Sequence, residues 1–271
     1  MSKLYFLGNS TKVQMFGCVI VSDGKTVVID GGAFGDNRQL TELLLEVSGG
    51  QVDAWFFTHP HHDHIGAFYK IIKHPGKITV NNIFHRFPPL DMLKKHGSRH
   101  DGEITLWEHL FSMLENDLAD KVILINEKDC YKFGEVTISV LRTYNDGILA
   151  NFVNNSSAVL RIDGKAASVL ILGDLGKEGG DDLKEKCSRD SLEADYTQMA
   201  HHGQGGVRRE LYEYISPKRC IWPSPDWLWD NDNGEGFDTG PWQTVRTREW
   251  MDAIGAKEHI IEKDGTQIIE I

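Results

Sequence analysis

Two observations on the sequence predict a layered α/β fold. Short apolar runs rich in Val, Ile and Leu alternate with segments of helical periodicity along most of the chain. Several of these runs are continuously apolar, as expected of strands that are covered on both faces. Helices usually provide that cover, so we expect layers of helix and sheet around a shared core.

Strands and helices are expected in turn along the chain. A short strand is expected within residues 1–8. Further strands are expected at residues 18–21, 26–29, 52–57, 136–141, 158–162, 168–172, 196–200, 220–222, 259–261 and 267–271. Helical periodicity is found at residues 38–46, 65–73, 103–118, 183–186, 207–214 and 244–253.

We expect one domain, residues 1–271, with two irregular segments. Residues 84–121 hold a Pro-Pro pair, a polar stretch and a helix but no strand of their own, which is typical of an insertion over the body. Residues 222–242 are rich in Trp, Asp, Asn and Gly. A loop of that length in a compact domain is often a binding loop.

The composition narrows the classes of partner. The net charge is −11, and an acidic chain repels phosphate backbones, so broad nucleic-acid binding is not expected. No apolar stretch approaches the ~20 residues of a membrane span, and the N-terminal apolar run is too short for a secretion signal. We therefore expect a cytoplasmic protein without a membrane partner. The cysteines form no CxxC pair and are expected to be reduced and buried, namely Cys18, Cys130, Cys187 and Cys220.

The strongest motif is His59-Pro60-His61-His62-Asp63-His64, which has the pattern HxHxDH. It directly follows the strand expected at 52–57, and sites in layered α/β folds form beyond the carboxyl ends of strands. Imidazoles mixed with carboxylates suit Zn²⁺, Fe or Mn. The motif therefore predicts a metal site.

Three further groups of His and Asp stand at expected strand ends. They are Asp30, Asp174 and the pair His201-His202. Strand ends can converge in space, and two metals held close together need a bridging carboxylate. Asp174 is the natural bridge.

These segments resemble successive motifs of the metallo-β-lactamase superfamily. The motifs are Ile29-Asp30-Gly31-Gly32, Thr58 to Gly66, Leu172-Gly173-Asp174 and Ala200-His201-His202-Gly203. The resemblance runs from Met1 to about Pro223. It implies a four-layered αβ/βα sandwich and two divalent metal ions, with Zn²⁺ as first choice and Mn²⁺ or Fe as alternatives.

The resemblance also implies a ligand set. The first metal takes His59 and His61, and the second takes Asp63, His64 and a His of the last motif, with Asp174 bridging. Asp30 then stands behind the ligands and orients them. A His followed by Gly is the commoner ligand position in this fold, which favours His202. His201 is then free to act as a general acid or to bind a substrate oxygen.

One departure concerns the third motif, where many relatives have a His. This chain reads Asn154-Asn155-Ser156-Ser157 there. That segment, together with His-His-Gly, is similar to the ComEC-like branch as a stand-alone soluble domain, and more distantly to phosphorylcholine esterases. We expect water or a carbonyl of Asn155 in place of the missing imidazole.

The predicted activity is hydrolysis by a metal-bound hydroxide, with a phosphodiester as the favoured substrate. Asp63 and Asp174 hold the nucleophile, and His201 protonates the leaving group. The partner is then a small-molecule or phosphoester substrate. The alternatives are lactone or thioester hydrolysis at the same site, an Fe-dependent oxidoreductase, and a binding module with a degenerate metal site.

The Trp-rich segment has two interpretations. Its aromatic and acidic side chains either pack the long loop or form a wall for a cationic substrate group. They are Trp222, Trp227, Trp229, Trp242, Asp226, Asp230 and Asp232. Among the other His residues, His85 and His100 are the ones that would border the cleft if residues 84–121 lie beside it.

Overall fold

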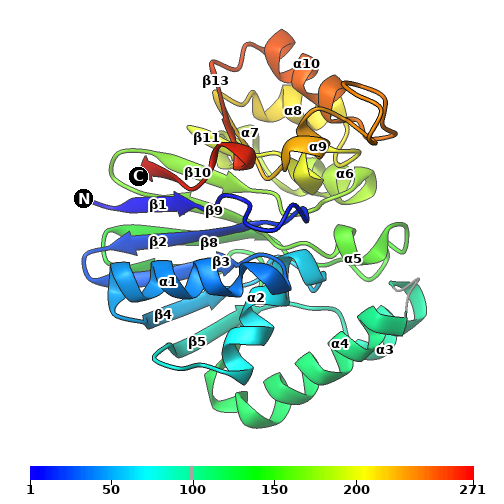
Figure 1. Ribbon diagram of the computed structural model, residues 1–271. Coiled ribbons are helices and arrows are strands. Elements are labelled where there is room, and N and C mark those ends of the chain that lie inside the picture. The colour runs from blue at the N-terminus through cyan, green and yellow to red at the C-terminus, as the bar shows by residue number, and fades with distance from the viewer. Residues whose placement is uncertain (98–100) are drawn as a thin grey trace.

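Two seven-stranded sheets form the centre of the computed structural model, which describes residues 1–97 and 101–271 (Figure 1). In sheet order, the first sheet contains β14 (Gln267–Glu270), β1 (Lys3–Phe6), β2 (Gly17–Ser22), β3 (Lys25–Asp30), β4 (Gln51–Phe56), β5 (Thr79–His85) and β6 (Val122–Leu124). The second contains β13 (Glu258–Ile261), β12 (Arg219–Trp222), β11 (Tyr196–Gln198), β10 (Ser168–Ile171), β9 (Val159–Asp163), β8 (Val136–Arg142) and β7 (Cys130–Phe133).

Helices cover the outer faces of the two sheets, and some of the short ones lie beside the strand ends. The helices are α1 (Asn37–Ser48), α2 (His62–Lys73), α3 (Leu90–His96), α4 (Asp101–Ser112), α5 (Phe152–Asn155), α6 (Lys177–Lys186), α7 (Arg189–Leu192), α8 (Arg209–Ile215), α9 (Asp226–Trp229) and α10 (Thr244–Ile254). Figure 1 shows α1, α2 and α4 on one side of the molecule and α6, α8 and α10 on the other.

Three apolar clusters define the layers. The inner faces of the two sheets meet in one cluster, which includes Ile29, Phe56, Leu160 and Ile171. A second cluster lies between the first sheet and α1, α2 and α4, and a third lies between the second sheet and α6, α8 and α10. The order is therefore helix, sheet, sheet, helix, which confirms the predicted αβ/βα sandwich.

The strand directions place the ends that matter for function. Strands β3 to β6 run parallel to one another, and so do β10 to β13. The chain leaves β4 in the first sheet, and β10 and β11 in the second, directly before the segments that carry the predicted metal ligands, and β3 ends at Asp30. Both sheets thus deliver their carboxyl ends to one region.

Several expected elements differ from the observed ones. Strand β5 was not predicted, because Asn81 and Asn82 are unusual in strands. Helix α6 begins at Lys177 rather than at 183, because Gly179 and Gly180 mask its periodicity. The expected helix at 103–118 ends at Ser112 and continues as a wider π-helical turn, Met113–Asp117.

The four cysteines are free thiols. Cys18 and Cys220 are buried and Cys187 is half-buried, but Cys130 is exposed on the edge strand β7, so the expectation of burial is wrong there. None of the helices among the described residues combines the length and the apolarity of a membrane span.

Candidate metal centre

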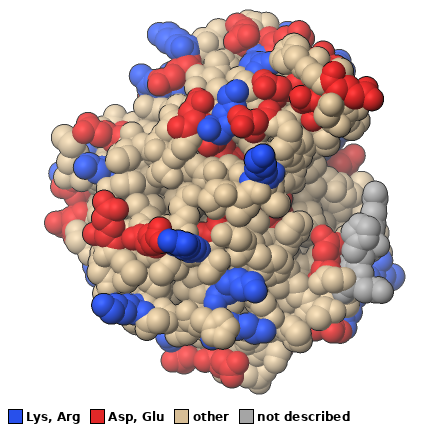
Figure 2. All heavy atoms as spheres, in the orientation of Figure 1, with Lys and Arg blue, Asp and Glu red and all other residues tan. Residues whose placement is uncertain are grey.

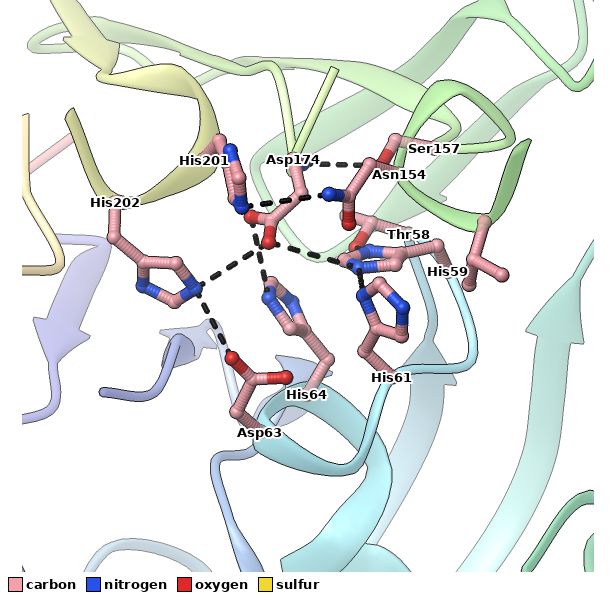
Figure 3. A network of polar contacts seen from close by, with 12 residues as sticks. Thr58, His59, His61, Asp63, His64, Asn154, Ser157, Asp174, His201 and His202 are labelled. Carbon is pink, nitrogen blue, oxygen red and sulfur yellow. Dashed lines mark hydrogen bonds and ion pairs between the residues drawn. The ribbon is translucent and has the colours of Figure 1, made fainter. Parts of the chain in front are cut away.

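The predicted metal ligands meet where the two sheets end (Figure 3). The loop after β4 and the first turn of α2 carry the HxHxDH motif, the loop after β10 carries Asp174, and the loop after β11 carries His201 and His202. Gly66 lets α2 approach the turn that follows β3, because a Cβ there would lie 2.5 Å from the backbone nitrogen of Phe34.

The ligand atoms form two groups that share Asp174. One group is Asp63, His64, Asp174 and His202, and the other is His59, His61 and Asp174. Within each group the ligand atoms lie within 4.8 Å of one another. Figure 3 shows His202 and Asp63 on one side of Asp174 and His59 and His61 on the other. The two groups could each hold a metal ion, with Asp174 between them.

The ligand atoms of the first group lie close together, yet several of them have no hydrogen-bond partner. His64 Nε2 lies 3.2 Å from Asp174 Oδ1, and His202 Nε2 lies 3.3 Å from Asp63 Oδ2 and 3.4 Å from Asp174 Oδ2. Nevertheless His64 Nε2, His202 Nε2 and Asp174 Oδ1 are buried without a hydrogen-bond partner. Unsatisfied buried polar atoms are rare, and a cation bound between these three atoms would satisfy all of them. The donor set therefore fits a metal.

Asp30 fixes the orientation of His64. Its Oδ2 accepts a hydrogen bond from His64 Nδ1 at 2.8 Å, which turns His64 Nε2 toward Asp174. The same oxygen accepts the hydroxyl of Thr58 at 2.7 Å, and Thr58 N donates to Asp30 Oδ1 at 2.8 Å. A carboxylate behind a ligand imidazole is the usual way to fix its tautomer.

Thr58 extends this support to the second group. Because its hydroxyl donates to Asp30, its oxygen is free to accept from His59 Nδ1, 3.1 Å away. His59 then presents Nε2 to the site, where it lies 3.0 Å from His61 Nδ1 and 3.7 Å from Asp174 Oδ2. One buried carboxylate thus orients imidazoles on both sides of Asp174.

The side chains of the two adjacent histidines of the last motif point in different directions. His202 donates from Nδ1 to the carbonyl of Pro223 at 2.8 Å, which leaves Nε2 directed at Asp63 and Asp174. His201 Nε2 instead lies 3.3 Å from Asn154 Nδ2. The geometry places His202, not His201, among the grouped ligand atoms.

The charges of the first group favour a cation. Burial opposes ionisation, but His202 and His64 hold the pKa of Asp63 and of Asp174 well below the usual range. In return, despite burial, Asp174 and Asp30 raise the pKa of His64 to about 10, and Asp174 and Asp63 raise that of His202. Both shifts favour positive charge between these carboxylates, which is the charge that a metal ion would supply.

Three residues of the site have left-handed backbone conformations, namely Asp30 at φ 56°, His201 at φ 52° and His202 at φ 54°. Such conformations are strained for side chains other than Gly, and they cluster at functional sites. Three such residues in one site indicate that the rest of the fold holds these backbones in place despite their conformational strain.

The expected role of Asn155 at the metals is wrong in its geometry. Its side-chain oxygen accepts the backbone N–H groups of Gly176 and Gly179, at the start of α6. Its backbone carbonyl accepts from Arg142 Nη1 at 3.0 Å. Both oxygens are therefore engaged away from the ligand groups. The neighbouring Asn154 faces the site instead, and its Oδ1 is buried without a partner.

Sequence reasoning missed the residues that support the ligands. Gln14 Nε2 donates to Asp63 Oδ2 at 3.0 Å, Ser157 Oγ accepts from Asp174 N at 3.0 Å, and Trp107 Nε1 donates to the carbonyl of Pro60 at 2.8 Å. Each lies far from its partner in sequence. Only Thr58, which directly precedes the HxHxDH motif, offered a local signal.

The Trp-rich segment packs largely on itself. Trp222 is buried and Trp229 nearly so, and the two rings meet edge to face at 5.2 Å. Trp227 contacts Trp242 at 4.7 Å and donates to the carbonyl of Lys12. Figure 1 draws this segment in orange between α9 and α10. Figure 2 shows Asp and Glu side chains gathered on its surface.

Two further histidines were expected to border the cleft, and the one that the structure describes does not join the ligand groups. His85 is buried and lines a separate apolar pocket of about 530 Å³ with Phe87, Leu114 and Tyr144. His100 lies outside the described residues.

Comparisons with known proteins agree on the fold. The metallo-beta-lactamase fold protein YhfI from Bacillus subtilis has a TM-score of 0.60 and 16% identity, with 100% of both chains covered. A diphosphatase from the PhnP family has a TM-score of 0.53 and 12% identity, covering 100% of this chain and 98% of its own. CmlA, a diiron beta-hydroxylase from Streptomyces venezuelae, has a TM-score of 0.53 and 11% identity, and the match covers 54% of its chain. No curated protein sequence matches this chain.

At these identities the solved structures show the fold alone. The family model extends the agreement to the sequence, because it matches residues 18–264, a span that includes both groups of ligand atoms. The chain therefore belongs to the metallo-beta-lactamase superfamily.

Proposed function

We propose that the protein is a metal-dependent hydrolase that cleaves phosphodiester-type substrates. The observation that carries the proposal is the carboxylate of Asp174, which lies between the two ligand groups. Its Oδ1 is 3.2 Å from His64 Nε2, and its Oδ2 is 3.4 Å from His202 Nε2 on one side and 3.7 Å from His59 Nε2 on the other. This arrangement suits two divalent metal ions, of which Zn²⁺ is our first choice.

Bound divalent ions would lower the pKa of a coordinated water and neutralise charge on a phosphoryl group. The chain's own residues supply orientation and proton transfer. Gln14 and His202 hold Asp63, and Ser157 holds the backbone of Asp174. In the reaction a water releases one proton to solvent, its oxygen bonds to phosphorus, the ester P–O bond breaks, and the leaving oxygen takes a proton.

His201 is the proposed donor of that proton. It is the one histidine of the HxHxDH and last motifs that faces the site, is not among the grouped ligand atoms, and is still partly open to solvent. Asn154 lies against its Nε2 and can position the ring. A positioned imidazole within reach of the leaving oxygen contributes about 10²- to 10⁴-fold to a rate.

Two similarities favour a phosphodiester over a lactone, a thioester or a β-lactam. The segment Asn154–Ser157 and the His-His-Gly motif are similar to the ComEC-like branch. A diphosphatase of the PhnP family shares the fold over the whole chain, although at an identity that shows fold only. The motif similarity points to phosphorus rather than to an acyl carbon, and the diphosphatase is an example of a phosphorus substrate on this fold.

Hydrolysis of bis-p-nitrophenyl phosphate by metal-loaded protein tests the proposal, beside a lactone, a thioester and a β-lactam. We expect turnover of the phosphodiester and its loss in Asp174→Asn. Turnover of only the acyl substrates would overturn the phosphodiester assignment, and full activity in Asp174→Asn would overturn the bridging role. His62→Ala, which changes an exposed histidine outside both ligand groups, is the matched control.

Metal analysis of protein purified without added metal tests the choice of ion. We expect zinc, and manganese would also be consistent with a hydrolase. Iron together with oxygen-dependent turnover and no hydrolysis would instead favour an oxidoreductase, and CmlA, a diiron beta-hydroxylase, has the same fold.

A further inference from the structure

A second feature beside the ligand groups is a pocket of about 330 Å³. It lies between the start of α6, the turn after His202, α8 and α10. The charged and amide side chains in its wall that matter here are Lys177, Gln204, Arg208, Arg209, Gln243 and Arg246. Four of these are cationic and a single carboxylate, Glu210, lines the same pocket. The pocket is thus basic in a chain whose net charge is −11.

The cations of this basic pocket are only partly neutralised. Arg208 Nε pairs with Asp181 at 3.0 Å, and Arg209 Nε pairs with Glu213 at 2.8 Å. Lys177 and Arg246 have no carboxylate partner within residues 1–97 and 101–271, and Arg246 stacks over the ring of Trp250 at 5.4 Å. Two unpaired cations in one concave wall match the charge of one phosphate monoester group.

The basic pocket is connected to the ligand groups through two glutamines. Gln204, in the pocket wall, donates from Nε2 to Gln14 Oε1 at 3.0 Å, and Gln14 donates in turn to Asp63 Oδ2 at 3.0 Å. Gln204 also follows His202 by two residues in the chain. If the ester of a substrate lies at Asp63 and Asp174, a neighbouring group of the same substrate can therefore reach the basic pocket.

The backbone keeps this wall open. A Cβ on Gly205 would have a single atom within 4 Å, Gln243 Nε2 at 4.0 Å, so the turn leaves space on the pocket side. A Cβ on Gly206 would lie 2.7 Å from the carbonyl of Ala200, so the turn also packs directly on the loop that carries His202.

From these observations we infer that the basic pocket binds a phosphate monoester group carried by the substrate, next to the ester that is hydrolysed. This inference rests on the proposed hydrolase function and narrows its substrate class to phosphodiesters that bear a second phosphate. Arg and Lys donors suit such a dianion, and the planar guanidinium can bind it through two hydrogen bonds.

The first experiment measures binding without turnover. Chelator-treated protein is titrated with inorganic phosphate by calorimetry at low ionic strength, with acetate as the carboxylate comparison. We expect phosphate to bind and Arg246→Gln to weaken it about tenfold, the size of one charge-assisted hydrogen bond. Arg38→Gln, which removes an exposed arginine paired with Glu42 on α1, controls for net charge.

Lys177→Gln gives a second, independent variant, because Lys177 lies at the start of α6 and Arg246 in α10. Weaker binding in either of the two variants locates the phosphate at this pocket. The inference is wrong if phosphate does not bind, if acetate binds as well as phosphate, or if both variants bind phosphate as tightly as Arg38→Gln does.

The second experiment uses two diesters that differ by one phosphate. They are thymidine 5′-(p-nitrophenyl phosphate) and the same compound with a 3′-phosphate. We expect wild type to have the higher kcat/KM on the phosphorylated diester, and Arg246→Gln to lower the ratio of the two values about tenfold. An equal ratio in wild type and variant would overturn the inference. If neither diester is cleaved, the proposed function fails, while the phosphate titration still decides the pocket.

Discussion

Asp30 Oδ2 accepts a hydrogen bond from His64 Nδ1 at 2.8 Å, and the same oxygen accepts the hydroxyl of Thr58. Through Thr58 the contact reaches His59, which belongs to the other ligand group. The geometry of both groups therefore depends on one carboxylate that is itself not among the grouped ligand atoms. Asp30 is buried and has a left-handed backbone, which Asn tolerates among the non-Gly residues.

Asp30→Asn is expected to weaken metal binding about 10- to 100-fold, the usual cost of losing a partner behind a ligand. The amide nitrogen of Asn cannot accept hydrogen bonds, so His64 or Thr58 loses its acceptor. Asn keeps the backbone conformation, so the fold should survive. Competition with a chromophoric chelator measures the affinity.

Asp36→Asn provides the comparison for that experiment. Asp36 is also buried, and it accepts hydrogen bonds from Ser10 Oγ and from the backbone of Ala33. It supports no ligand imidazole, so a loss of stability without a loss of metal affinity is expected. Equal metal affinity in Asp30→Asn and wild type would contradict the role given to Asp30.

The sequence predicts the parts of this site that are local or that follow from strand ends. The HxHxDH motif supplies its ligands within one loop and one helical turn. Asp174 and His202 could be placed because they directly follow apolar runs. The preference for His202 over His201 came from the resemblance alone. The contact that orients His202, from its Nδ1 to the carbonyl of Pro223, could not be predicted from the sequence.

What the sequence did not predict depends on contacts between distant segments. Asn155 stood in the right motif, but the start of α6 occupies its side-chain oxygen. Gln14 and Trp107 lie 49 and 47 residues from their partners in the motif. Strand β5 was missed because its two Asn residues are unusual in strands. It forms nevertheless, because it pairs with a parallel strand on each side.

His61→Ala is expected to reduce the metal content from two ions to one. The group of His59, His61 and Asp174 has three protein ligands, and two are too few to hold an ion against dialysis. The group around Asp63 keeps all four of its members. Elemental analysis after dialysis gives the ratio of metal to protein. In His62→Ala the ratio should remain two, and a ratio of two in His61→Ala would show that this imidazole is not a ligand.

Glu262→Gln is expected to stabilise the protein above about pH 5. Burial raises the pKa of Glu262 well above its usual range, and its Oε2 has no hydrogen-bond partner. As pH rises past the ordinary Glu pKa of about 4.3, the unfolded chain releases this proton while the folded chain keeps it, so folding stability falls. Each unit of difference between the two pKa values costs about 1.4 kcal/mol.

Urea unfolding at pH 4.5 and pH 7.5 checks this expectation for Glu262. The gain of Glu262→Gln over wild type should be larger at pH 7.5, since both proteins carry a neutral group at low pH. Glu258→Gln changes a surface residue of β13 and should show no such increase. A gain that is independent of pH would mean that titration of Glu262 does not contribute.

Trp107→Phe is expected to lower the free energy of unfolding by about 1–3 kcal/mol and to weaken metal binding. The indole donates to the carbonyl of Pro60, and Phe leaves this buried acceptor without its partner. Pro60 lies between His59 and His61, so the lost contact loosens the loop that carries both.

Trp229→Phe is the matched control, because it removes similar apolar area from an indole that packs on Trp222. Thermal unfolding and chelator competition, each run on both variants, separate the two effects. Equal metal affinity in Trp107→Phe and Trp229→Phe would show that α4 supports the fold without supporting the metal loop.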